Sequence, residues 1–213
     1  MREKTTERRL SAAYAGVVDA MILAAQGRPH QSWLVTAALA GDGTTTTAIG
    51  IAAALAARNH QALLLDANLK DPCLSRRLAE TQSPGLAQLI QNGQRIEEVC
   101  RREEQGGFSV VPAGTTGDAA VELLGRLRAA EVLGELSRRY DFVIVDTPAL
   151  ETGLDALALA PHVDGCVLVV RAGKTGRAAL LRSKQQIEQA GGKITGLVFN
   201  RRRRWVPRLF GGR

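Results

Sequence analysis

The segment whose residue types point most directly to phosphate chemistry is a run of glycines and threonines, residues 41–47. It follows the apolar stretch 33–37 and precedes the helical stretch 49–58, so we predict a loop between a strand and a helix. Gly41 and Gly43 can adopt backbone angles closed to other residues and allow a phosphate to approach closely, while the N-terminus of the following helix favours an anion. The predicted nucleotide contacts in this loop are Gly41, Asp42, Gly43, Thr44, Thr45 and Thr46.

This loop lacks a lysine. In a working phosphate-binding loop, a lysine reaches the β and γ oxygens and the next Ser/Thr hydroxyl holds Mg²⁺. Thr44 occupies the lysine position, and Thr45 occupies the position of the magnesium ligand. No lysine or arginine lies between Trp33 and Ile51. The sequence therefore predicts a phosphate site without its usual cation.

Two aspartates, Asp66 and Asp146, each end an apolar run. Ligands of open α/β sheets bind at the carboxyl ends of the strands, so both are candidate catalytic residues, and Asp146 together with Thr45 is a candidate magnesium ligand. The alternative is that both carboxylates only cap helices or loops, as strand-terminal aspartates do in many α/β domains.

Apolar runs alternate with helical stretches, which is typical of a parallel sheet flanked by helices. The predicted strands are 32–37, 62–66, 108–111, 142–146, 165–171 and 194–200. The predicted helices are 6–25, 45–59, 126–139 and 175–190. Residues 67–107 are predicted to be less regular. Because the strands are nearly all apolar, we expect an α/β fold whose mainly parallel sheet is covered on both faces, with residues 1–200 forming one domain and 201–213 a tail.

The composition limits the classes of function. A chain of 213 residues with 45% hydrophobic and 23% charged residues is ordinary for a soluble globular protein. The apolar runs are far shorter than a membrane span, and the three widely spaced cysteines indicate neither a disulfide framework nor a zinc site. Much of the net charge of +7 lies in the tail, so the body of the chain is closer to neutral.

The tail combines arginines with apolar side chains. The residues predicted to contact a membrane or a partner are Arg201, Arg202, Arg203, Arg204, Trp205 and Arg208. Each arginine near an anionic lipid surface contributes on the order of 1 kcal/mol, and Trp205 can enter the interfacial layer. Three alternatives stay open: a solvated end without a ligand, the phosphates of nucleic acid, and an acidic cytoplasmic loop of a membrane protein.

The two aspartate segments 65–72 and 141–148, following the glycine loop in this order, resemble the cytoplasmic P-loop domain of bacterial tyrosine autokinases. These act in capsule and exopolysaccharide synthesis and are a branch of the MinD- and ParA-like P-loop ATPases. The likeness covers about residues 10–200 and includes the phrase 196–200. It implies a P-loop NTPase fold, ATP or ADP with magnesium as cofactor, and a contact between Asn200 and the nucleotide base.

The chain departs from this family at positions that carry chemistry. Thr44 replaces the P-loop lysine, Leu39 stands where MinD and ParA proteins place a second lysine, and Asn68 replaces the second aspartate of its segment. An amide neither supplies negative charge to a metal nor accepts a proton as a carboxylate does. The autokinases also resemble one another in a C-terminal tyrosine cluster, whereas this chain contains only Tyr14 and Tyr140.

These departures favour a chain that is not an enzyme but a non-catalytic component of an exopolysaccharide or capsule synthesis and export machine. The resemblance implies a cytoplasmic position at the inner face of the bacterial membrane and a membrane polysaccharide co-polymerase as partner. A homo-oligomer stays open, because segment 12–18 keeps the tyrosine of the family's self-association motif and lacks its three charged residues. One alternative is an active kinase or ATPase with an unconventional phosphate clamp, in which Arg171, Lys174 or a neighbouring subunit's arginine supplies the charge. Another is a ParA-like DNA-positioning protein. Nucleotide binding without turnover, and no cofactor at all, both stay open.

Overall fold

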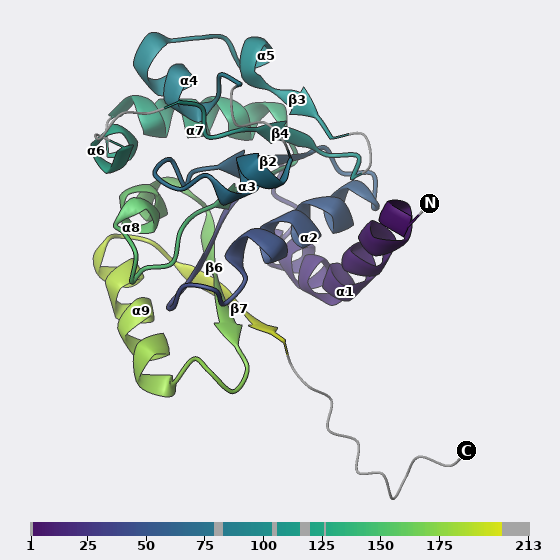
Figure 1. The fold of residues 1–213 in the computed structure, drawn as a ribbon, viewed down its shortest axis with the longest axis vertical. Helices are drawn as coiled ribbons and strands as arrows, with labels where there is room; N and C mark the ends of the chain where they lie inside the picture. Colours follow the sequence, from purple (N-terminus) through teal and green to yellow (C-terminus); the bar gives the residue numbers. More distant parts are fainter. Residues whose placement is uncertain (1, 79–82, 104–105, 116–119, 126, 202–213) are drawn as a thin grey trace, which may run out of the picture.

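The computed structural model describes residues 2–78, 83–103, 106–115, 120–125 and 127–201 (Figure 1). The strands are β1 (Gln31–Ala37), β2 (Ala62–Asp66), β3 (Arg101–Arg102), β4 (Ser109–Val111), β5 (Phe142–Asp146), β6 (Gly165–Arg171) and β7 (Ile194–Asn200). The helices are α1 (Arg2–Ala25), α2 (Thr44–Ala56), α3 (Cys73–Arg77), α4 (Leu86–Asn92), α5 (Ile96–Val99), α6 (Ala120–Leu124), α7 (Leu127–Arg139), α8 (Asp155–Leu159), the 3₁₀ turn η1 (Ala160–His162) and α9 (Arg177–Gln189).

The strands form one seven-stranded sheet in the order β3-β4-β2-β5-β1-β6-β7. All neighbours are parallel except β3 and β4, which are antiparallel. In the register of β2 and β5, Asp66 is the partner of Asp146. The carboxyl ends of these two strands and of β1 therefore meet at one edge of the sheet, where the glycine loop follows β1. The prediction of a mainly parallel α/β sheet is confirmed.

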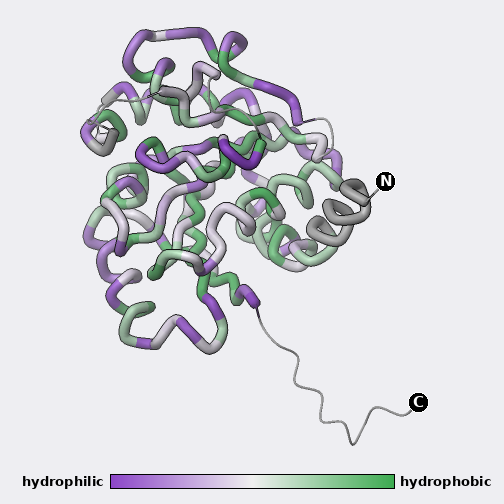
Figure 2. The backbone as a smooth tube through the Cα atoms, in the orientation of Figure 1, coloured by the Kyte–Doolittle hydropathy of each residue, from purple (hydrophilic) through white to green (hydrophobic). Residues whose placement is uncertain are grey.

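Two apolar layers cover the two faces of the sheet, because successive side chains of a strand point to opposite faces. On one face, Leu63 and Val145 pack against α4, α5, α6, α7, α8 and α9. On the other, Leu64 and Ile144 pack against α1, α2 and α3. Figure 2 shows the hydrophobic segments running through the central strands, whereas the segment from α5 to β3 at the rim is mostly hydrophilic.

Helix α1 lies beside α2 (Figure 1), and the contact is built around a glycine. Tyr14 is buried against Gly50, where an added Cβ atom would come within 2.2 Å of the tyrosine ring. The Tyr14 hydroxyl also lies 3.2 Å from the Thr47 hydroxyl. Val18 and Met21 continue this buried face, so α1 fixes the helix that begins at the predicted phosphate loop.

The predicted strands agree with the observed ones to within one residue, and the four predicted helices agree to within a few residues. The expectation for residues 67–107 was incomplete, because this region contains the short elements α3, α4, α5 and β3. Elements of two to seven residues are too short to show a hydrophobic period. Helices α6 and α8 were missed for the same reason.

The predicted tail contacts lie almost wholly outside the described residues. Of them only Arg201 is described, and it is an exposed residue directly after β7. Residues Arg202, Arg203, Arg204, Trp205 and Arg208 fall outside. Within the described ranges, none of the helices has the length and apolar character needed to cross a lipid bilayer.

Candidate functional site

A cleft of about 710 Å³ lies at the carboxyl edge of the sheet, against the first turn of α2. Its walls come from the glycine loop, the segment after β2, the segment after β5 and the residue after β7. The lining residues are Ala40, Gly41, Gly43, Thr44, Thr45, Thr46, Asn68, Lys70, Asp71, Cys73, Arg77, Pro148, Ala149, Thr152, Asp155 and Arg201. The structure thus places Gly41 and Gly43 through Thr46 together in one cavity, as the sequence predicted.

The two loop glycines have conformations that side chains disfavour. Gly41 has a φ of +77° and Gly43 a φ of +102°, both in the left-handed region. An added Cβ atom at Gly43 would also lie 2.1 Å from Nδ2 of Asn200. Gly43 is therefore required both for the turn and for the approach of Asn200, and it caps α2, whose first N–H groups have no partner within the helix.

Asn200 and Asp42 attach the loop to β7 and to the segment after β6. The Asn200 side-chain amide donates to the Asp42 carbonyl at 2.8 Å, and the Thr175 hydroxyl donates to Oδ2 of Asp42 at 2.6 Å. Asp42 is fully buried, and its Oδ1 has no partner among the described residues. Neither Asp42 nor Asn200, both predicted nucleotide contacts, is among the described residues that line the cleft. In this structure the Asp42 side chain binds Thr175, and the Asn200 side chain binds the loop backbone.

Asp146 is a buried carboxylate beside the loop. Its side chain is 1% exposed, and its Oδ1 has no hydrogen-bond partner within the described residues. Burial raises the pKa of Asp146 well above its ordinary value, and the neighbouring Asp66 raises this pKa further. The Thr45 hydroxyl and the Arg77 charge act in the opposite direction. The environment of Asp146 thus calls for a proton or a cation.

Asp66, also fully buried, has a different environment. Its Oδ2 accepts from the Ser75 amide at 2.8 Å and from the Ser75 hydroxyl at 2.7 Å. Its Oδ1 accepts from the Asn68 amide at 3.1 Å. Burial raises the pKa of Asp66, whereas the Ser75 and Asn68 bonds lower it. Asp66 therefore holds α3 onto β2, and it is not among the described residues lining the cleft.

Asn68 lines the cleft, but its side chain makes a hydrogen bond within its own loop. Its Oδ1 accepts from the Asp71 amide at 3.1 Å, which is a local turn typical of asparagine. The next charged residue, Lys70, also lines the cleft.

The residues at the loop fit a nucleotide-bound magnesium ion in their donor chemistry. Mg²⁺ prefers oxygen ligands and keeps several waters and phosphate oxygens in its shell, and the unpartnered Asp146 oxygen and the Thr45 hydroxyl are both hard oxygen donors. No cluster of three or more His, Cys, Asp or Glu side chains suited to a metal occurs within the described ranges. A magnesium here would thus depend on phosphate oxygens as well as on Thr45 and Asp146.

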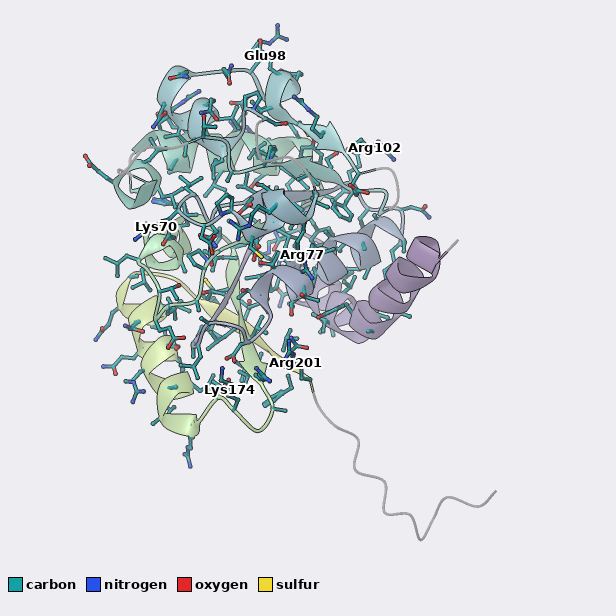
Figure 3. All side chains as sticks on the ribbon, in the orientation of Figure 1. Lys70, Arg77, Glu98, Arg102, Lys174 and Arg201 are labelled. Atoms are coloured by element: carbon teal, nitrogen blue, oxygen red, sulfur yellow. The ribbon has the colours of Figure 1, made fainter. Side chains whose placement is uncertain are left out.

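Sequence reasoning missed the charged residues Lys70, Asp71, Arg77 and Asp155 as contributors to the cleft. Arg77, at the end of α3, donates from Nη1 to the Thr46 hydroxyl at 2.9 Å. Asp155, at the start of α8, is 3% exposed and has an unpartnered Oδ1 among the described residues. Neither Arg171 nor Lys174, the cations considered from sequence, is among the described residues that line the cleft. Figure 3 shows the positions of Lys70, Arg77 and Arg201, with Lys174 near Arg201 in this view. No signal for Arg77 existed because α3 itself was not predicted.

Comparison with known proteins agrees with the fold and the site. The AAA domain family matches residues 35–189 of this chain. The tyrosine-protein kinase CpsD of Streptococcus agalactiae is 27% identical over 82% of this chain and 77% of its own length. The crystal structure of the VpsO kinase domain is 28% identical, covers 95% of this chain and 98% of that domain, and has a TM-score of 0.82. The expected resemblance to bacterial tyrosine kinases is confirmed.

A more distant structure shows the fold alone. The cell division ATPase MinD of Pyrococcus furiosus is 22% identical, covers 81% of this chain and 72% of that chain, and has a TM-score of 0.70. The predicted MinD-like P-loop fold is therefore confirmed.

Proposed function

The chain belongs to the AAA domain family, and we propose that it acts without catalysis in a bacterial capsule or exopolysaccharide synthesis and export machine. The observation that carries this proposal is Thr44. It begins α2 and lines the cleft at the position where the kinases it resembles carry the P-loop lysine. The polysaccharide pathway comes from the resemblance to the capsule autokinases.

The loss of the lysine bears directly on phosphoryl transfer, which depends on positioning and on neutralising charge as the terminal phosphate departs. Removing one pre-organised electrostatic contact of this kind costs roughly 10²- to 10³-fold in rate. Thr44 offers a hydroxyl without charge. Asn68 adds to the loss, because its oxygen accepts from the Asp71 amide and carries no negative charge.

The absence of a carboxylate with a free role after β2 supports the same proposal. Asp66 accepts three hydrogen bonds from Ser75 and Asn68, which makes it a structural group. Among the described residues at this edge of the sheet, the buried carboxylates with an unpartnered oxygen are Asp42, Asp146 and Asp155. None of them lies in the segment after β2, where the kinases that the chain resembles carry their second aspartate, and the loop itself has no lysine.

The proposed place of action is the cytoplasmic face of the cell membrane, docked on a membrane polysaccharide co-polymerase. The retained kinase-like fold would provide the docking surface, and the arginines that begin at Arg201 would add affinity for anionic lipid. Sedimentation with phosphatidylglycerol vesicles and with duplex DNA, at low and high salt, separates this placement from a ParA-like role. Salt-sensitive DNA binding without vesicle binding would favour the DNA-positioning alternative.

A turnover assay tests the absence of catalysis. The chain, its Asp146→Asn variant and CpsD of Streptococcus agalactiae are incubated with Mg-ATP, and ADP release is measured. We expect the chain to match its own Asp146→Asn variant. ADP release at the rate of CpsD that is lost in Asp146→Asn would overturn the proposal in favour of an enzyme with an unconventional clamp.

A further inference from the structure

Three positively charged side chains border the cleft, although none comes from the glycine loop. Lys70 follows β2, Arg77 ends α3, and Arg201 follows β7. Figure 3 shows Lys70, Arg77 and Arg201 around the same edge of the sheet, with Arg77 beside the start of α2. The charge missing at Thr44 is thus replaced in the cavity by side chains from other segments.

Arg77 is the one of the three with a fixed contact to the phosphate loop. Its Nη1 donates to the Thr46 hydroxyl at 2.9 Å, across 31 residues of sequence. Helix α3, which carries Arg77, is attached to the end of β2, because Ser75 donates to the buried Asp66 carboxylate from both its amide and its hydroxyl. The Ser75 hydroxyl also accepts from the Ala113 amide at 3.0 Å. Arg77 is therefore held over the first turn of α2 before any ligand arrives.

The neighbouring arginine shows that this placement is specific. Arg76 donates from Nη1 to Asp71 at 2.6 Å in an exposed ion pair, and it is not among the described residues lining the cleft. Two adjacent arginines of one short helix thus have different partners. Only Arg77 faces the loop residues.

We propose that Arg77 takes the place of the missing P-loop lysine and binds the terminal phosphate of a nucleoside di- or triphosphate in this cleft. The proposal goes beyond the non-catalytic function proposed above, because it adds a nucleotide that the cleft binds without turnover. A guanidinium has five N–H donors, of which the Thr46 bond uses one, and its planar fork suits two phosphate oxygens. The first-turn amides of α2 face the same anion.

The surrounding charges fit a phosphate held in this way. The Asp146 carboxyl interacts with the Thr45 hydroxyl and with the charge of Arg77, and one of its oxygens has no partner among the described residues, so it would be available to a magnesium on the same phosphate. An arginine that enters from α3 and the β2 side is not attached to the loop, so it binds the phosphate from a different direction than a P-loop lysine. The arrangement explains how affinity for a nucleotide persists without the lysine that phosphoryl transfer uses.

Isothermal titration calorimetry with Mg-ADP, the non-hydrolysable Mg-AMP-PNP and AMP tests this role. We compare the unmodified chain with Arg77→Gln, with Arg77→Lys as the conservative variant, and with Arg76→Gln as the matched control; thermal melting shows that each is folded. Arg77→Gln is expected to weaken Mg-ADP and Mg-AMP-PNP binding by roughly 10- to 100-fold, as for the loss of a charged hydrogen bond. In Arg77→Gln, the affinity for AMP should change by less than about twofold. In Arg76→Gln, the affinities for Mg-ADP and Mg-AMP-PNP should also change by less than about twofold, because an exposed charge away from the ligand contributes little. Arg77→Lys should recover part of the affinity lost in Arg77→Gln.

Equal affinities in the unmodified chain and Arg77→Gln would overturn the inference, as would an equal loss in Arg76→Gln. If the unmodified chain binds neither Mg-ADP nor Mg-AMP-PNP, the inference fails while the non-catalytic function stands. If the chain instead hydrolyses ATP at the rate of CpsD and Arg77→Gln still weakens binding, the non-catalytic function fails while Arg77 keeps its role.

Discussion

The carboxyl ends of β2 and β5 present the same residue type at the same height of the sheet, yet the two aspartates have opposite environments. Asp66 and Asp146 are register partners, and both are buried. Three donors from Ser75 and Asn68 satisfy Asp66, whereas one oxygen of Asp146 has no partner among the described residues. One end is closed by the protein itself, and the other keeps capacity for a ligand.

The difference shows that burial alone does not identify a functional carboxylate. Burial raises the pKa of both aspartates. Three hydrogen bonds from Ser75 and Asn68 oppose this effect at Asp66, whereas at Asp146 only the Thr45 hydroxyl and the Arg77 charge do so. Buried polar groups are normally paired, so an unpaired one indicates a site for a ligand, a proton or an ion. By this criterion Asp146, beside Thr45, belongs to the candidate site together with Asp42 and Asp155, which also have an unpartnered oxygen among the described residues, and Asp66 belongs to the scaffold.

The largest expected effect comes from removing a hydrogen-bond donor of Asp66. Ser75→Ala removes the hydroxyl hydrogen bond to Asp66 and the acceptor of the Ala113 amide, whereas the bond from the Ser75 backbone amide to Asp66 remains. A buried charge and a buried amide then lose partners, and we expect a loss of about 3 kcal/mol in unfolding free energy. Urea denaturation measures it. In an Asp66→Asn background the same substitution should cost less, because the two residues are coupled; additive costs would show that Ser75 acts independently of Asp66.

A second change adds one positive and one negative side chain to the cleft beside Asp146. Thr44→Lys together with Asn68→Asp restores the family residues on two walls of the cleft. A cation on the first turn of α2 should strengthen Mg-ATP binding about tenfold, the effect of one charged hydrogen bond. Calorimetry gives the affinity, and Thr44→Gln, which adds length without charge, serves as the control. An unchanged affinity in the double variant would mean that the cleft is closed to phosphate for another reason.

The sequence was sufficient for the sheet and for the loop, and the reason is local. The strands are apolar runs bounded by turns, and the glycines of the loop are required by backbone geometry, as the φ of +102° at Gly43 shows. Both signals depend on residues next to one another. The pairing of Asp66 with Asp146 was not predicted, because it depends on the strand order, which places β2 beside β5.

Sequence could not distinguish the two aspartates or find Arg77. The donor that closes Asp66 is Ser75, nine residues away and on a helix of five residues that shows no period. The same helix carries Arg77 to the loop. Contacts of this kind depend on how a short segment packs against the sheet. A segment this short has no hydrophobic periodicity from which its packing could be predicted. The expected contact between Asn200 and a nucleotide base stays a prediction, because the structure shows the Asn200 side chain bonded to the Asp42 carbonyl.

A third prediction contrasts the same substitution at the two ends. Asp146→Asn removes a carboxyl whose pKa is raised, so the folded protein binds this proton more tightly than the unfolded chain and loses stability as pH rises through the folded pKa. The variant should gain about 1 kcal/mol at pH 8, and the gain should shrink as pH falls toward 5. Asp66→Asn should lose stability at both pH values, because its new amide must face a donor from Ser75 or Asn68. Urea denaturation of both variants measures this contrast, and a loss of stability in both would remove it.

The smallest effect concerns the hydroxyl beside Asp146. The Thr45 hydroxyl lowers the pKa of Asp146, against the upward effect of burial. Thr45→Val should therefore raise this pKa further while changing the unfolding free energy by only about 0.5 kcal/mol, the low end for one hydrogen bond. Carboxyl carbon NMR follows the titration directly, with Thr44→Val as the control on the same helical turn. If both variants shift Asp146 equally, the general polarity of the helix end controls its titration and Thr45 has no specific role. If Thr45→Val alone shifts it, the open end contains a hydroxyl and a carboxylate coupled closely enough to share a magnesium ion.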